Sequence, residues 1–192
     1  MTRHLDLGCG MFPMNPYKAD DLYGVDIRTI AELQENFRYS RVDLTTEALP
    51  FPDEYFDSLS AFDLLEHIPR SIVLQNTGTR FPFVDLMSEI SRVLKPGGLF
   101  YAITPCYPDI AAFSDPTHVN IITKKTHLYF CGEKPLGRIY GFKGSFRCRS
   151  ARLTYGAIGN SANEKSFQIF LKHLRKRFKG QLSHIFWELE KM

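Results

Sequence analysis

The sequence lacks several features that would point to particular classes of protein. It has no uninterrupted run of the roughly 18 apolar residues that a membrane-spanning helix needs. Its four cysteines are scattered without C-x-x-C spacing, so neither a zinc site nor a disulfide framework is expected. Residues 1–4 lead directly into an expected strand, so we predict no secretory leader. Because unpaired cysteines are typical of a reducing compartment, we predict a cytoplasmic location.

Internal repeats, low-complexity tracts and Gly/Ser linkers are also absent from the chain. Its 192 residues, 44% of them hydrophobic, can bury one substantial core, which predicts a single domain over residues 1–192. Acidic residues are scarce in one segment, because residues 138–180 carry 11 Lys/Arg and only one acid, Glu164, in a chain of net charge +3. We therefore expect a positive face near the C-terminus.

The most informative feature that the sequence does contain is a glycine turn followed by an acid. A short apolar segment runs into D-x-G-x-G at Asp6–Gly10, and a second apolar segment, Leu22–Val25, ends at Asp26. Glycines allow the backbone to turn tightly and to approach a ligand closely. An acid at the tip of the next strand can accept hydrogen bonds from two ribose hydroxyls, and would be costly to bury without donors. This pattern predicts a nucleoside-cofactor site.

Hydrophobic periodicity predicts strands that alternate with helices. Strands are expected at residues 4–7, 22–27, 39–44, 56–62, 99–104, 146–158 and 183–190. Helices are expected at residues 28–37, from 64 onward, at 83–94 and at 167–178, and residues 105–145 read as an irregular insertion. The alternation favours a parallel sheet with helices on both faces. The last two strands lack a crossover pattern, which favours an antiparallel pair at one edge.

Five motifs, in order, resemble those of the class I S-adenosylmethionine-dependent methyltransferase family. They are Leu5–Gly10, Val25–Ile27, Val42–Leu44 with Leu49–Phe51, Phe56–Ile68, and the E-x-x-R-V-L-K-P-G-G stretch Glu89–Gly98. The resemblance implies a Rossmann-like three-layer α/β sandwich whose seven-stranded, mostly parallel sheet has an antiparallel last strand. It divides the domain into a cofactor half (about 1–104), a substrate-covering insertion (105–145), and edge strands with a basic helix (146–192).

The resemblance also implies S-adenosyl-L-methionine as the cofactor and assigns roles by position. Gly8 and Gly10 would pass under its methionine part, Asp26 would hold the ribose hydroxyls, and Asp43 would receive the adenine amino group. Phe62 would supply backbone contacts near the sulfonium. The residues predicted to bind the cofactor are Asp6, Gly8, Cys9, Gly10, Asp26, Ile27, Asp43, Leu44, Phe62, Asp63, Glu66 and His67.

Some of these side chains have simpler explanations, which stay open here. Asp6 orients the glycine loop or caps a turn, and Asp43 also suits a turn or helix cap. Asp63, Glu66 and His67 have the spacing to share one helix face and bind a metal ion. Since an acid in a first turn also complements the helix dipole, we predict no metal site.

The segment Ser114–Asn120 follows the expected fifth strand, on the side where a transferred methyl group would emerge. Similar D-P-T-H segments occur in the family near the acceptor pocket. An unperturbed histidine titrates near pH ~6.5, so His118 is the candidate catalytic base. The alternative is that Asp115 and Pro116 form a turn and the ring bonds the backbone. Tyr107 and His127 are weaker candidates.

The sequence thus predicts methyl transfer from S-adenosylmethionine to a small or medium, possibly anionic, small-molecule acceptor. One alternative is a nucleic-acid methyltransferase that uses the basic helix 165–179, although no RNA-binding module is visible and this partner is disfavoured. Another is a non-catalytic cofactor-binding module. A nicotinamide-dependent oxidoreductase would want G-x-G-x-x-G, but Pro13 stands at the third glycine. The acceptor and the oligomeric state stay open.

Overall fold

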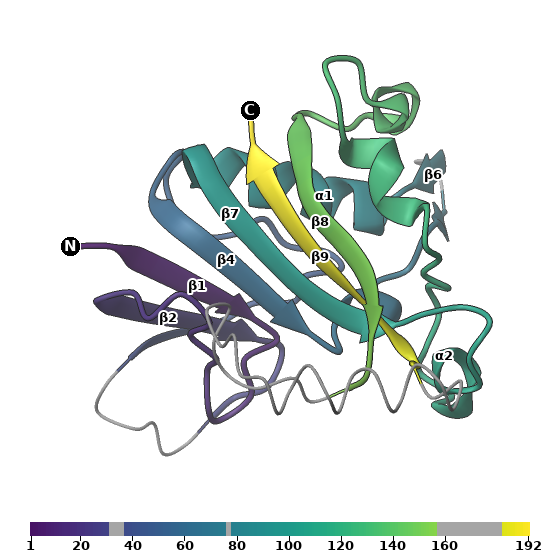
Figure 1. Ribbon diagram of the computed structural model, residues 1–192, viewed down its shortest axis with the longest axis horizontal. Helices are drawn as coiled ribbons and strands as arrows, with labels where there is room; N and C mark the ends of the chain where they lie inside the picture. The colour runs from purple at the N-terminus through teal and green to yellow at the C-terminus, as the bar shows by residue number, and fades with distance from the viewer. Residues whose placement is uncertain (31–36, 76–77, 157–181) are drawn as a thin grey trace.

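The computed structural model describes residues 1–30, 37–75, 78–156 and 182–192 (Figure 1). Seven strands form one sheet in the order β3-β2-β1-β4-β7-β9-β8. Their bounds are Arg3–Leu7 for β1, Asp21–Asp26 for β2, Arg38–Arg41 for β3, Phe56–Phe62 for β4, Leu94–Pro105 for β7, Phe146–Thr154 for β8 and His184–Lys191 for β9.

The strand directions confirm the predicted Rossmann-like α/β fold. The pairs from β3 through β2, β1 and β4 to β7 are all parallel. The last strand, β9, runs antiparallel to both of its neighbours, β7 and β8, as Figure 1 shows. Strand β8 therefore keeps the direction of the parallel strands, and the last two strands form the predicted antiparallel pair at one edge.

The two faces of the sheet carry different side chains because successive residues of a strand point to opposite sides. On one face, strand residues such as Leu5, Leu59 and Phe100 join the main core, which also includes the apolar side of helix α1 (Pro82–Val93). Figure 1 shows α1 behind the sheet. On the other face, Tyr101, Ile103 and Phe186 form a smaller hydrophobic cluster. Polar side chains of β1 and β4 are buried on this second face.

Helix α1 agrees with the predicted helix to within one residue at each end, but two neighbouring predictions are wrong. Strand β7 begins at Leu94 instead of residue 99, because the Lys-Pro-Gly-Gly stretch forms a bulge within β7, opposite Phe56 and Ser58 of β4. The helix expected from residue 64 is one 3-10 turn, η1 (Leu65–His67). It ends because Ile68 precedes a proline and takes the extended conformation.

The insertion 105–145 has little regular structure, as predicted. It contains the short helix α2 (Ala111–Ser114) and the 3-10 turns η2 (Thr126–Phe130) and η3 (Leu136–Tyr140). A small antiparallel hairpin of β5 (Ile72–Leu74) and β6 (Gly78–Arg80) was not predicted, because its residues are mostly exposed and show no apolar alternation. The expected helix at 167–178 and most of that at 28–37 lie outside the described residues. Among the residues that are described, no helix has the length and apolar character that crossing a membrane requires.

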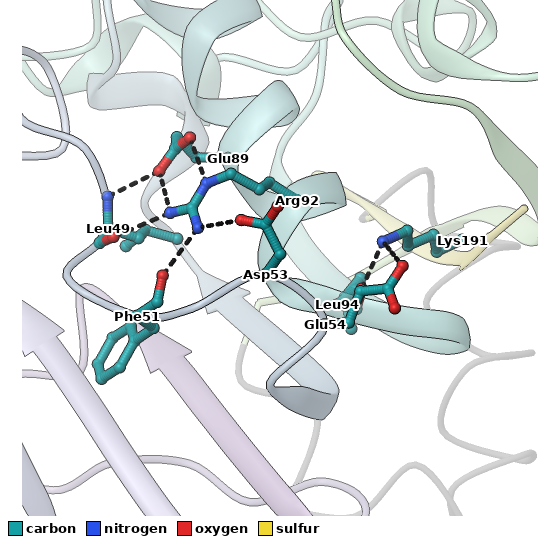
Figure 2. A network of polar contacts seen from close by, with 8 residues as sticks. All are labelled: Leu49, Phe51, Asp53, Glu54, Glu89, Arg92, Leu94 and Lys191. Atoms are coloured by element: carbon teal, nitrogen blue, oxygen red, sulfur yellow. Dashed lines mark hydrogen bonds and ion pairs between the residues drawn. The ribbon is translucent and has the colours of Figure 1, made fainter.

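The E-x-x-R part of the fifth motif has a structural role (Figure 2). Arg92 of α1 donates hydrogen bonds to the carbonyl oxygens of Leu49 and Phe51 and pairs with Asp53 and Glu89. Glu89 in turn accepts the N–H of Leu49 at 2.9 Å. These contacts fasten the loop that precedes β4 to the helix.

Candidate active site

The predicted cofactor residues converge because parallel strands end at one edge of the sheet. Leu7, the last residue of β1, is paired with Val25 of β2 and with Ala61 of β4. The turn after β1 therefore lies between the ends of β2 and β4. This edge is where open α/β sheets bind their ligands.

The two glycines of the turn have conformations that other residues rarely adopt. Gly8 has φ +65° and Gly10 has φ +58°. A Cβ on Gly8 would also lie 2.9 Å from the Cδ1 atom of Leu64. Cys9 between them is buried, and its thiol packs against the backbone of β2 at Gly24. The turn thus has the tight backbone geometry that the glycines predicted, and its role as a cradle for the cofactor stays a prediction.

Asp6 holds this turn in place from a buried position. Its carboxylate accepts the N–H of Met14 at 2.7 Å and the hydroxyl of Ser60 at 2.5 Å. Burial raises the pKa of Asp6 to about 7, because these two hydrogen bonds only partly offset the loss of solvent. The loop-orienting interpretation of Asp6 fits these contacts.

A buried polar chain that sequence analysis missed continues from Asp6 across the sheet. The ring of His4 contacts Ser58 through Nδ1 at 2.7 Å and Ser60 through Nε2 at 2.8 Å. Burial lowers the pKa of His4 to about 3. The sequence does carry one signal for this chain. His4 and Asp6 are two residues apart on β1, as Ser58 and Ser60 are on β4, so each pair lies on one face of its strand.

Asp26 lies at the tip of β2, and its carboxylate is already satisfied by the chain. One oxygen accepts the N–H of Gly10 at 2.9 Å, and the other accepts the N–H of Arg28 at 3.0 Å. The Arg28 guanidinium adds a bidentate contact, 2.8 Å to each oxygen. This guanidinium holds the pKa of Asp26 at about 2. The donors that a buried acid needs are thus provided here by the chain itself, and the Arg28 side chain that provides two of them is 63% exposed.

The remaining cofactor candidates differ in how they are placed. Ile27 is 56% exposed beside Asp26, whereas Leu44 is buried in the core. Asp43 uses one carboxylate oxygen to accept the N–H of Thr45, which is the turn-capping role left open for it. Phe62 packs against the ring of Tyr101.

Asp63 does not share a helix face with Glu66 and His67. It lies outside η1 with φ +45°, and its carboxylate is 3.2 Å from Nε2 of His184 on β9. The expected helical spacing fails because η1 is a single turn. Asp63 therefore faces β9, at the far side of the strand edge from Asp26.

Glu66 and His67 instead meet His118 from the insertion. The carbonyl oxygen of Glu66 accepts the N–H groups of Val119 and Asn120, both at 2.9 Å, so the segment that contains His118 is fastened to η1. The rings of His67 and His118 are 4.8 Å apart, and Nε2 of His118 is 3.9 Å from Oε1 of Glu66. The other oxygen, Oε2, accepts the hydroxyl of Thr104. Burial raises the pKa of Glu66.

The weaker candidates lie apart from this cluster. Tyr107 is 53% exposed, and His127 is buried beside Trp187. A cavity of about 490 Å³ lies elsewhere, between the start of α1 and the two 3-10 turns of the insertion. Its lining includes Arg70, Phe83, Lys125 and Tyr140, and no predicted site residue.

A glycine cradle beside a strand-tip acid, on a sheet of this order, defines a nucleoside-cofactor enzyme fold. A methyltransferase-domain family model matches residues 5–102, which is half of the chain. The chain therefore belongs to the class I S-adenosylmethionine-dependent methyltransferases, and this confirms both the predicted family and its cofactor. No curated protein sequence shows a significant match to it.

Solved structures show the same fold at low identity. One is a chain from a complex that contains the Haloferax volcanii Trm112 methyltransferase activator, with TM-score 0.61 and 13% identity, covering 98% of this chain and 81% of that one. A second is an Archaeoglobus fulgidus S-adenosylmethionine-dependent methyltransferase, with TM-score 0.56 and 16% identity, covering 100% and 86%. A third is geranyl diphosphate C-methyltransferase from Streptomyces coelicolor, with TM-score 0.55 and 13% identity, covering 100% and 71%.

Proposed function

We propose that this protein transfers the methyl group of S-adenosylmethionine to a small or medium acceptor. The observation that carries the proposal is the contact between the glycine turn and Asp26, at the edge where the sheet binds ligands. Gly10 donates its N–H to Asp26 at 2.9 Å, so the cradle and the acid form one rigid unit. When bound, the cofactor supplies a methyl group that is already electrophilic.

The residues at this edge fit the cofactor. Gly8 and Gly10 offer a backbone surface without side chains, and Asp26 offers two acceptor oxygens for a ribose diol. Ile27 provides an exposed apolar side chain beside Asp26 for a flat base. Arg28 must rotate away from Asp26 before the diol can bind. The Arg28 side chain is 63% exposed, so water can hydrate the guanidinium when it leaves, while the ribose hydroxyls take over the buried carboxylate of Asp26.

The chain's own contribution to transfer is positioning and the exclusion of water. The insertion is fastened to η1 by the N–H groups of Val119 and Asn120, and we expect it to cover the acceptor. His118 stays the candidate base from sequence reasoning, with Glu66 as the carboxylate nearest to its ring. A base is needed only for an acceptor that loses a proton.

The three arginines of β8 each have a partner within the described residues. Arg147 and Arg149 contact Glu190 at 3.5 and 2.7 Å, and the Arg152 guanidinium lies over the ring of Phe186. The Arg147 and Arg149 side chains are 63% and 52% exposed, so these contacts do not decide between a small acceptor and nucleic acid. A gel shift that weakens with salt and is lost on charge reversal at residues 172–179 would favour nucleic acid.

The test of the proposal is cofactor binding by an Asp26→Ala variant. Loss of two hydrogen bonds to a charged acceptor, each worth about 1.5–3 kcal/mol, should weaken binding at least about 100-fold in calorimetry with the demethylated cofactor. The control is Asp85→Ala, which removes a partly exposed ion pair with Arg80 and leaves every predicted cofactor residue in place. Equal affinity in the Asp26 variant and the wild type would refute the assignment.

A further inference from the structure

Three side chains that bind transition metals in other proteins converge at η1. Glu66, His67 and His118 each offer one ligand atom, and these three atoms lie within 4.8 Å of one another. Ligands at about 2.0–2.1 Å from a tetrahedral ion are about 3.4 Å apart, so small side-chain rotations would suffice. The convergence is built into the backbone, because Glu66 accepts two N–H groups from the segment that follows His118.

Two polar atoms of this cluster are buried without a partner among the described residues. Within that part of the chain, Oε1 of Glu66 and Nδ1 of His118 form no hydrogen bond, while the residue Glu66 is 1% exposed and the His118 side chain is 9% exposed. A buried acceptor without a donor costs about 1–3 kcal/mol, and more when it is charged. Oε1 of Glu66 and Nε2 of His118 are 3.9 Å apart, which is too long for a hydrogen bond. A cation between them would satisfy the carboxylate.

The third side chain, His67, is held in the form that can bind a metal. The hydroxyl of Thr117 is 2.6 Å from Oδ1 of Asp115 and 3.0 Å from Nδ1 of His67. The Thr117 hydroxyl has one hydrogen, which it donates to the carboxylate of Asp115, because a carboxylate can only accept. Nδ1 of His67 must therefore carry a hydrogen and donate it to the hydroxyl oxygen of Thr117. The lone pair of His67 is therefore on Nε2. Outer partners of this kind orient histidine ligands in metal sites.

We propose that Glu66, His67 and His118 bind a divalent first-row transition metal ion of the Zn²⁺ type. Two imidazole nitrogens and one carboxylate suit such an ion and leave at least one coordination position open. Asp63, which the sequence grouped with Glu66 and His67, is not a ligand, and His118 takes its place. This proposal departs from the sequence-based prediction of no metal site.

The open position would have a use in catalysis, and this part rests on the proposed function. Glu66 contacts Thr104 near the end of β7, at the strand edge beyond which the acceptor would lie. A metal there would bind an acceptor oxygen and lower the pKa of its hydroxyl. His118 would then serve as a ligand and not as a base.

The test uses the tag-free full chain, stripped with a chelator and titrated with Co²⁺ and Zn²⁺ in the absence of cofactor. We expect one equivalent of Co²⁺ with intense visible absorption, displaced by Zn²⁺. Glu66→Gln and His118→Ala should weaken binding by at least 100-fold. Thr117→Val, which leaves all three ligands in place, should weaken it about 10–100-fold. His184→Ala, a histidine outside the cluster, should bind as wild type does.

Thermal unfolding without metal separates metal binding from folding. Glu66→Gln keeps the contact with Thr104 and removes a buried charge, so it should melt no lower than the wild type. No saturable Co²⁺ binding by the wild type, or equal affinity in Glu66→Gln, His118→Ala and His184→Ala, would overturn the proposal. Cofactor affinity is measured separately with the demethylated cofactor, so failure of the metal site and failure of the proposed function give different results.

Discussion

The glycine turn and η1 differ in whether their buried polar groups have hydrogen-bond partners within the described residues. At the turn, the chain provides every partner, since Asp6 accepts from Met14 and Ser60, and Asp26 accepts from Gly10 and Arg28. At η1, Glu66 and His118 each keep one buried atom that has no partner in the part of the chain that the structure describes. The first region is built to hold its shape before a ligand arrives, whereas the second leaves a carboxylate oxygen of Glu66 for a ligand to contact.

Among the predictions below, the largest effect is expected on unfolding free energy, when the hydrogen-bond network around Arg92 is broken. Arg92→Ala removes the donor to two carbonyl oxygens and the partner of Glu89 and Asp53 (Figure 2). We expect a loss of about 3 kcal/mol in unfolding free energy, because a partly buried charge and two acceptors lose their partner. Urea unfolding followed by circular dichroism measures it. A loss below about 1 kcal/mol, typical of an exposed ion pair, would show that the network contributes little.

The His4–Asp6 chain should give two opposite pH dependences. The pKa of Asp6 is raised to about 7, so the folded protein holds a proton that the unfolded chain releases above about pH 4. The contribution of Asp6 to stability is thus lost as pH rises from about 4 to 7. The pKa of His4 is lowered to about 3, so its contribution is lost as pH falls from about 6.5 to 3.

Single variants separate these two effects. Unfolding free energy between pH 4 and 6.5 should rise more steeply with pH in Asp6→Asn than in the wild type, because only the His4 effect remains. It should fall with pH in His4→Gln. The limit for one proton is about 1.4 kcal/mol per pH unit. Identical pH profiles for both variants and the wild type would contradict the assigned shifts.

The smallest effect tests whether Arg28 stands in for a ligand. Arg28→Ala frees both oxygens of Asp26 and should raise cofactor affinity about twofold to fivefold, since an ion pair with an exposed arginine is worth at most about 1 kcal/mol. Calorimetry with the demethylated cofactor measures this change, and Arg149→Ala, which removes an ion pair with Glu190 on β9, is the matched control. A fall in affinity would mean that Arg28 contacts the cofactor itself.

The fold was predictable because its signals are local. Helix α1 places Leu86, Met87 and Ile90 on one buried stripe, and the strands that form the sheet are apolar segments bounded by turn residues. The errors arose where the same residues permit two structures. The Lys95–Gly98 stretch reads as a stop signal, yet it forms a bulge within β7. Pro69 shortened η1, although the sequence before it resembles the start of a helix.

The site was predictable only in part, because its contacts depend on long-range pairing. The glycine turn and Asp26 carry their own signals. Nothing in the sequence indicates that Arg28 covers Asp26, because a contact two residues along the chain has no periodic pattern. His118 joins Glu66 and His67 through backbone hydrogen bonds between Glu66 and the segment after His118, some 50 residues further along the chain.

The most direct test of the central claim is a crystal structure with the demethylated cofactor bound. We predict its ribose hydroxyls on the carboxylate of Asp26, its amino-acid part over Gly8 and Gly10, and the Arg28 guanidinium turned away from Asp26. Cofactor bound elsewhere, with Arg28 still on Asp26, would contradict the account.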